Sequence, residues 1–176
     1  MEFEKTNLEG LLLIRPRVFE DNRGYFFESY HSALFSEAGI NVSFVQDNQS
    51  MSDKGVLRGL HFQRDPYAQG KLVRVLQGSV LDVAVDIRKE SPTYGRHYKQ
   101  VLSGGNKLML WIPAGFAHGF LTLEDKTVFF YKCTTFYNKS SEASIRWNDP
   151  VLDIEWGIKR PIVSEKDALA PLFNNY

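Results

Sequence analysis

The chain has 176 residues, enough to bury one hydrophobic core, and it carries 21 basic and 21 acidic side chains. Such a balance gives no overall field to attract a nucleic acid or an acidic membrane, and no apolar run approaches the roughly 20 residues of a membrane-spanning helix. The single cysteine, Cys133, excludes an intramolecular disulfide and is typical of a reducing compartment. The first residues also lack the basic start and apolar core of a signal peptide. The sequence therefore predicts one cytoplasmic domain, residues 1–176.

The N-terminal part of the chain alternates between short extended, turn-like and helical patterns. Apolar and aromatic runs that are too short for helices predict strands, and clusters of Asp, Asn and Gly predict turns. One stretch has a serine as a candidate N-terminal cap, apolar residues at helical spacing and a glycine stop at Gly39. In chain order we expect a strand at Gly10–Ile14, a turn at Asp21–Gly24, a strand at Tyr25–Glu28, a helix at Ser29–Ala38, a strand at Val42–Gln46 and a turn at Asp47–Ser50.

From Val56 onward the pattern is almost entirely that of strands. In Val80–Ile87, Leu81, Val83, Val85 and Ile87 alternate with Val80, Asp82, Ala84 and Asp86, which predicts a strand with two different faces. Further strands are expected at Leu72–Leu76, Tyr98–Leu102, Leu108–Ile112, Phe116–Leu123 and Thr127–Thr135. Many short strands at this spacing favour an all-β sandwich or barrel of the jelly-roll kind. The tail from Asn148 is expected to be irregular, with a short helix after Ser164.

The most informative stretch is Arg58–Gln63, followed closely by Gly70–Arg74. Strand alternation places His61 and Gln63 on one face and Arg58 on the other. If the first face lines the inside of a barrel, burial can turn His61 into a tuned acid or base. The alternative is a core histidine with a satisfied hydrogen bond.

A second motif, Pro113-x-Gly115-x-x-His118, resembles the second motif of the cupin superfamily, a small jelly-roll barrel. In many cupins this histidine binds a metal together with a His-x-His pair and a glutamate. Here Gln63 stands where the second histidine of that pair would be, and no glutamate follows closely. Two histidines and an amide are a poor site for a divalent metal, so the sequence predicts a metal-free barrel.

Several longer segments, in order along most of the chain, resemble the dTDP-4-dehydrorhamnose 3,5-epimerases, which act on nucleotide sugars. These segments are Asp21–Glu28, Gln46–Ser50, Val56–Gln63, Gly70–Val75, Gly78–Thr93, Trp111–Phe120, Trp147–Pro150 and Ser164–Asp167. The resemblance implies an all-β, cupin-like jelly-roll barrel with a few short helices. It also implies a dTDP-linked 4-keto sugar as substrate, no cofactor, and a homodimer in which the segment with Arg23 reaches into the partner's site.

The resemblance also implies a role for each of four side chains. His61 would be the base that removes a proton alpha to the 4-keto group, and Asp167 would orient it. Lys71 would stabilise the enolate, and Tyr131 would return a proton from the opposite face. Each has an ordinary alternative: Lys71 a solvated lysine, Tyr131 a core aromatic, Asp167 an exposed acid, with Asp82 as another carboxylate that could orient His61.

The same family pattern implies a larger set of substrate-binding residues. Arginine forks suit a diphosphate and amides suit a pyrimidine edge. The set is Arg23, Phe26, Glu28, Gln46, Asn48, Arg58, His118 and Lys166. Phe26 and Tyr137 could stack on the base or pack in the core, and Arg74 could contact a phosphate or form a surface ion pair.

The sequence is also compatible with three rival functions. An epimerase acting at C3 or C5 alone would use the same base and acid in a differently shaped pocket. A metal-dependent cupin isomerase or dioxygenase would use His61 and His118 as ligands. A sugar-nucleotide-binding barrel without catalysis would bind the nucleotide with no turnover.

Overall fold

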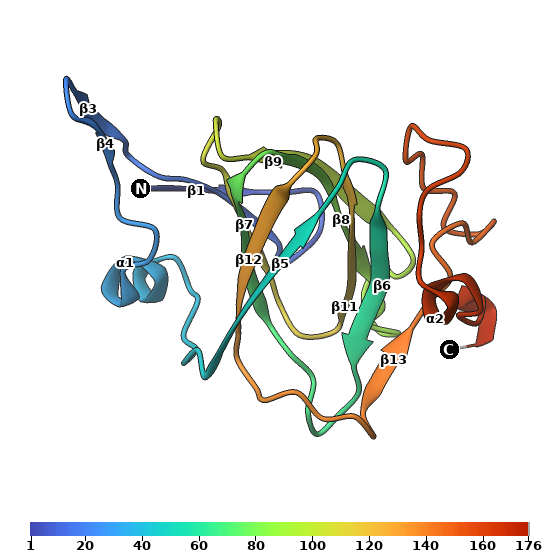
Figure 1. Ribbon diagram of the computed structural model, residues 1–176. Coiled ribbons are helices and arrows are strands. Elements are labelled where there is room, and N and C mark those ends of the chain that lie inside the picture. The colour runs from blue at the N-terminus through green and yellow to red at the C-terminus, as the bar shows by residue number, and fades with distance from the viewer. Residues whose placement is uncertain (176) are drawn as a thin grey trace.

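Two antiparallel sheets form the body of the protein, and the computed structural model describes residues 1–175, with Tyr176 outside the described residues (Figure 1). The strands of the six-stranded sheet lie in the order β1 (Glu2–Lys5), β2 (Leu12–Arg15), β10 (Met109–Ile112), β7 (Lys71–Gln77), β12 (Thr127–Cys133) and β5 (Gln46–Ser52). Those of the five-stranded sheet lie in the order β13 (Glu142–Ser144), β6 (Leu57–Gln63), β11 (Phe116–Thr122), β8 (Ser79–Asp86) and β9 (His97–Ser103). The two sheets face each other as in a jelly roll, which confirms the predicted fold class.

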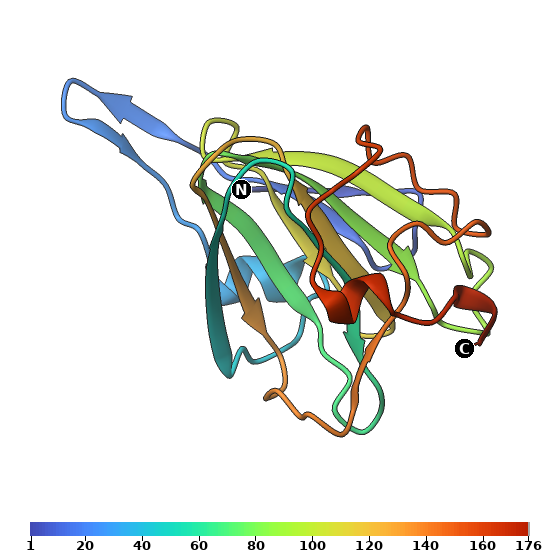
Figure 2. The ribbon, with the colours of Figure 1, turned by 45° about the vertical axis from the view of Figure 1, so that its right-hand side comes forward.

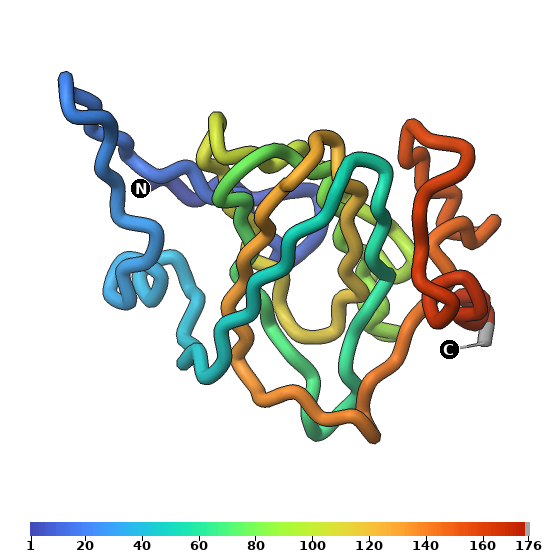
Figure 3. Tube along the Cα trace, in the orientation of Figure 1, coloured from blue at the N-terminus to red at the C-terminus, as the bar shows by residue number. Residues whose placement is uncertain are grey.

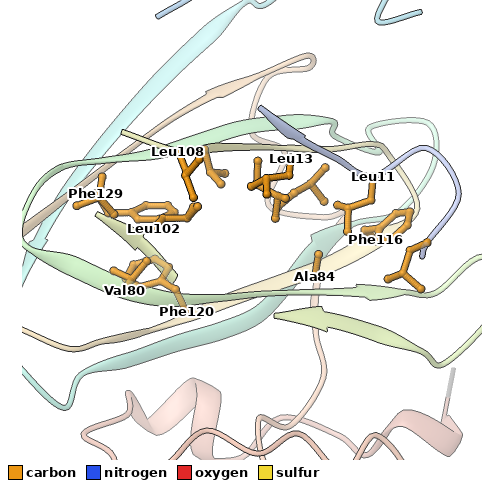
Figure 4. Packing of buried hydrophobic residues seen from close by; sticks show 14 residues of the cluster. Leu11, Leu13, Val80, Ala84, Leu102, Leu108, Phe116, Phe120 and Phe129 are labelled. Atoms are coloured by element: carbon orange, nitrogen blue, oxygen red, sulfur yellow. The ribbon is translucent and has the colours of Figure 1, made fainter. Parts of the chain in front are cut away.

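The main core lies between the two sheets. Leu13 and Leu110 from one sheet, with Leu11 just before β2, face Val80, Ala84 and Phe120 from the other (Figure 4 labels most of this cluster). On β8, Val80 and Ala84 belong to this inner cluster, whereas Leu81, Val83 and Val85 belong to a cluster on the outer face. The alternation predicted for this strand is therefore confirmed.

Each outer face of the barrel is covered by a different part of the chain. The helix α1 (Ser32–Glu37) covers the six-stranded sheet, with Phe35 and Ile40 packed against Leu72 and Trp111. The C-terminal tail covers the five-stranded sheet with Leu152, Trp156 and Phe173, and it contains α2 (Glu165–Ala168) and a 3₁₀ turn (Phe173–Asn175) (Figure 3). The helix expected after Ser164 is thus present, capped by the Ser164 hydroxyl, which accepts a hydrogen bond from the Asp167 amide. None of the helices in residues 1–175 has the length and apolar character needed to cross a bilayer.

A small hairpin, β3 (Phe19–Asp21) with β4 (Gly24–Phe26), projects from the body and is called the arm below. It stands away from the barrel in both views (Figures 1 and 2). Its large apolar side chains stay exposed: Phe19 by 51%, Tyr25 by 58% and Phe26 by 66%. Single cations lie over two of these rings, Arg17 over Phe19 and Lys107 over Tyr25, but the described chain does not bury any of the three.

Two of the local predictions in the N-terminal part are wrong. Residues 42–45 are irregular, and the expected turn at 47–50 is the middle of β5. This strand lies at the sheet edge and pairs only with β12, so its polar side chains can alternate between the barrel mouth and solvent. The expected helix at 29–38 is also shorter, because it begins after His31 rather than at Ser29 and ends before Gly39, whose φ is +87°.

Candidate active site

A cavity of about 270 Å³ opens between the two sheets at the end where β5 lies. It is lined by Asn48, Gln49, Ser50, Arg58, His61, Lys71, His118, Gly119, Phe120, Phe129 and Tyr131. Six of the twelve residues predicted for the site therefore share one hollow. A larger hollow of about 670 Å³ near Gln63 and Arg88 contains none of the twelve.

His61 and Asp167 form a hydrogen-bonded pair at the cavity wall. The His61 Nε2 lies 2.6 Å from Asp167 Oδ1, and the Gly59 amide donates to the other carboxylate oxygen at 3.3 Å. Burial by itself would raise the pKa of Asp167, but the hydrogen bonds from His61, Gly59 and Ser164 hold it below its usual value. An ionised Asp167 accepts a hydrogen bond from the Nε2–H group of His61, and in this tautomer Nδ1 keeps its lone pair.

The cavity contains a second pair of the same kind. His118 Nε2 lies 2.9 Å from Asp82 Oδ2, and both side chains are almost completely buried. The strand register places His118 directly opposite His61 on adjacent strands. Asp82 therefore orients His118, and the alternative in which Asp82 orients His61 is wrong.

Arg58 lies on the cavity side together with His61, contrary to the prediction that they face opposite ways. Between the pairs His118–His61 and Phe120–Arg58, β6 advances three residues while β11 advances two. This extra residue is a bulge, which reverses the alternation on one side of it. Gly59 permits it, because its φ is +127° and a Cβ there would lie 2.5 Å from the Gly119 Cα.

Lys71 and Tyr131 stand on the opposite wall, on neighbouring strands of the six-stranded sheet. Lys71 is 8% exposed, and its Nζ lies 5.9 Å from the centre of the Tyr131 ring. Burial lowers the pKa of Lys71, and Cys133 and Asp82 offset this only in part. Burial raises the pKa of Tyr131, so its phenol stays protonated at neutral pH. The solvated lysine and the exposed Asp167 that were the ordinary alternatives are both wrong, since each side chain is buried.

The remaining predicted residues lie beside the cavity or away from it. Gln46 donates to Asn48 at 3.0 Å, next to the cavity, and Lys166 forms an ion pair with Glu142 at 2.6 Å. Arg23, Phe26 and Glu28 lie on or beside the arm and do not line this cavity; Arg23 is paired with Asp21 instead. Glu142 was missed by the sequence prediction, and no local pattern marks it, because it meets Tyr137 and Lys166 only in the folded chain.

The residues present do not form a cupin metal centre. Gln63, at the position of the second histidine, donates to the Tyr67 and Phe136 carbonyls and accepts from the Asn138 amide, so both ends of its amide are used. Within residues 1–175, no group of three His, Cys, Asp or Glu side chains is placed to hold a metal ion. The two histidines that remain are each held by a carboxylate.

Fold and cavity together define a jelly-roll barrel whose cavity has a hydrogen-bonded histidine–aspartate pair on one wall and a phenol and an ammonium on the other, which are groups able to exchange protons. The family described as dTDP-4-dehydrorhamnose 3,5-epimerase matches residues 5–175. The chain belongs to this family, and the resemblance seen in the sequence is confirmed.

Three relatives match over nearly their whole length. The dTDP-4-dehydrorhamnose 3,5-epimerase of Salmonella typhimurium is 56% identical over 172 residues, which cover 97% of this chain and 94% of the relative. The crystal structure of the enzyme from Elizabethkingia anophelis superposes with a TM-score of 0.96 at 52% identity, covering 99% of this chain and 97% of that one. The Legionella pneumophila epimerase, solved in complex with dTDP-4-keto-L-rhamnose, gives a TM-score of 0.94 at 49% identity, covering 98% and 93%.

Proposed function

We propose that this chain, working as one jelly-roll domain, inverts C3 and C5 of dTDP-4-dehydro-6-deoxy-D-glucose to give dTDP-4-dehydro-L-rhamnose without a cofactor. The activity is that of the family to which the chain belongs. The observation that carries the assignment of roles is that His61 and Tyr131 lie on facing sheets around one cavity. Inversion of a carbon requires that a proton leave one face and return to the other, so a base and an acid on opposite walls suit it.

The hydrogens on C3 and C5 are acidic because both carbons are alpha to the 4-keto group. In the proposed mechanism Nδ1 of His61 removes such a hydrogen, and Asp167 stabilises the imidazolium that forms. The negative charge that develops on the keto oxygen is stabilised by Lys71, whose buried ammonium acts in a medium of low dielectric constant. Tyr131 then donates its phenolic proton to the opposite face of the carbon.

The test is to incubate the 4-keto-6-deoxyglucose nucleotide with the enzyme in D₂O and to follow the sugar by NMR. Deuterium at both C3 and C5 with inverted configuration is the expected result. Deuterium at one carbon would identify a single-site epimerase, and none would refute the epimerase function.

Two substitutions separate the roles of base and acid. His61→Asn should abolish both exchange and inversion, because no proton is removed, with a loss of about 10² or more. Tyr131→Phe should retain exchange with solvent but lose inversion, because His61 can still remove a proton and return one to the same face. His97→Asn and Tyr98→Phe are matched controls away from the cavity and should behave as the native enzyme. An equal loss of exchange and inversion in Tyr131→Phe would refute the role of the acid.

The second part of the proposal is a homodimer with shared sites, in which the arm of each chain completes the active site of its partner. Arg23, Phe26 and Glu28 are expected to bind substrate, yet none of them lines this chain's cavity. They lie on or beside the arm, which extends away from the barrel (Figure 2). Its exposed aromatic rings also need cover. A second copy of the chain would provide that cover and receive the three side chains in its own cavity.

A mixing experiment tests the shared site. Chains with His61→Asn and chains with Arg23→Ala should each be nearly inactive alone. If sites are shared, a mixed dimer contains one cavity with a native base and a native arm, so unfolding and refolding the mixture together should restore activity. If activity is not restored although mixed dimers form, the arm serves its own chain and the shared site is wrong.

The cellular location is part of the same proposal. Cys133 is a free, buried thiol, as is usual for proteins of a reducing compartment. We place the enzyme in the cytoplasm.

A further inference from the structure

Arg74 lies on the outer face of β7, next to the point where the arm joins the barrel. This part of the arm, Tyr25–Phe27, is called its foot below. Its guanidinium carbon is 5.4 Å from the ring centre of Phe27, the residue that follows β4, and 5.9 Å from that of Phe130. Phe130 is the register partner of Arg74 on β12 and precedes Tyr131. One flat cation therefore contacts the foot of the arm and the strand that holds the proposed acid.

No carboxylate of the described chain lies in the small hollow that contains Arg74. The Nε and Nη1 atoms of Arg74 are buried without a hydrogen-bond partner in the described chain, and burial lowers its pKa. Of the two roles considered from the sequence, the surface ion pair is wrong, because no carboxylate of the described chain pairs with this side chain, and the phosphate contact stays a prediction. Leaving buried N–H groups unpaired is costly, whereas an apolar side chain would fill the same space without that cost. What only the guanidinium provides is attraction to two ring faces.

A second cation contacts the same foot. Lys107 Nζ lies 4.3 Å from the ring centre of Tyr25, and the Tyr25 and Phe27 rings stack at 6.0 Å. The small hollow at this point, about 160 Å³, is lined by Tyr25, Phe27, Arg74, Val75, Leu76, Gly104 and Lys107, which include two cations and no carboxylate. Two cation–π contacts thus join the foot of the arm to the barrel.

We propose that Arg74, assisted by Lys107, is a positioning residue that sets the direction of the arm and thereby places Arg23, Phe26 and Glu28 in the cavity of a second copy. This inference rests on the shared site proposed above. Arg74 itself does not touch the substrate, so its loss should weaken substrate binding while the chemistry in a filled site is preserved.

The test compares Arg74→Met with Lys132→Met. Lys132 Nζ lies 5.8 Å from the same Phe130 ring but does not contact the arm, which makes it a matched control for the loss of one cation. Arg74→Met should raise KM roughly ten-fold, as expected for the loss of one or two cation–π contacts, with kcat within about two-fold of native. Hydrogen–deuterium exchange at the amides of residues 24–27 should accelerate in Arg74→Met alone. Arg74→Lys keeps a cation over the rings and should recover part of both effects.

Each outcome has a separate meaning. Native-like exchange at residues 24–27 in a folded Arg74→Met protein would overturn the anchoring role, whatever the activity. Faster exchange with an unchanged KM would overturn the link between the arm and substrate binding. Should Arg74→Met fail to fold, Lys107→Met removes the other cation–π contact to the foot of the arm, at Tyr25. Exchange at the amides of residues 24–27 should then also accelerate, and unchanged exchange would count against the proposal. Failure of the shared site shows separately, as a lack of restored activity in the mixing experiment.

Discussion

Replacing Lys71 by methionine should make the protein more stable and almost inactive. The lysine is 8% exposed, and Asp82, the carboxylate that acts on it in the described chain, is already hydrogen-bonded to His118. Methionine has a similar length and no charge to desolvate. Because removing an unpaired buried charge typically gains about 1 to 3 kcal/mol of unfolding free energy, Tm should rise by roughly 3–9 °C for a chain of this size. Turnover should fall by about 10²–10³, as for the loss of one group that stabilises an oxyanion.

The effect should depend on pH in a defined direction. Burial lowers the pKa of Lys71 below the ordinary lysine value of 10.5, so between the two pKa values the unfolded chain holds a proton that the folded chain has released. Stability of the native protein therefore rises with pH across that window. The advantage of Lys71→Met should be full below the folded pKa and should shrink as the pH rises toward 10.5.

The assay is thermal and denaturant unfolding at a fixed protein concentration, since the Tm of the proposed dimer would depend on concentration. Lys132→Met is the matched control: Lys132 is paired with Asp47 at the barrel surface, and its loss should change stability by no more than about 0.5 kcal/mol. A Lys71→Met protein that is less stable than native would refute the reasoning, because the ammonium would then have a compensating partner in the folded protein.

Three further predictions concern the cavity and its wall. Asp167→Asn should reduce kcat by about 10²–10⁴ with an unchanged far-UV circular dichroism spectrum, because His61 loses the carboxylate that holds its tautomer; activity near native would exclude the pair from catalysis. Gly59→Ala should yield little folded protein, since the new Cβ would lie 2.5 Å from the Gly119 Cα at a positive φ, and native solubility and Tm would contradict the close approach of β6 and β11. Prolonged treatment with a chelator should leave turnover unchanged, because Gln63, at the position of the missing second histidine, is already bonded to three backbone groups; loss of activity that returns with added metal would revive the metal-dependent cupin.

The sequence by itself determined the all-β fold, the family and most of the strands. The alternation in Val80–Ile87 predicts which side chains face the inner core, because successive side chains of a regular strand point to opposite faces of the sheet. His61, Lys71 and Tyr131 could be identified because family motifs are contiguous in the chain.

Only the tertiary structure decided which residues meet. A polar edge strand such as β5 has the composition of a turn, so its place became visible only through its pairing with β12. The bulge at Gly59 turns Arg58 toward the cavity, and simple strand alternation could not predict this. The sequence leaves open which of two aspartates bonds to which of two histidines. In the folded chain Asp167 bonds to His61 and Asp82 bonds to His118. Contacts between residues more than 30 positions apart depend on how the sheets and the tail pack, and local sequence patterns contain no record of that packing.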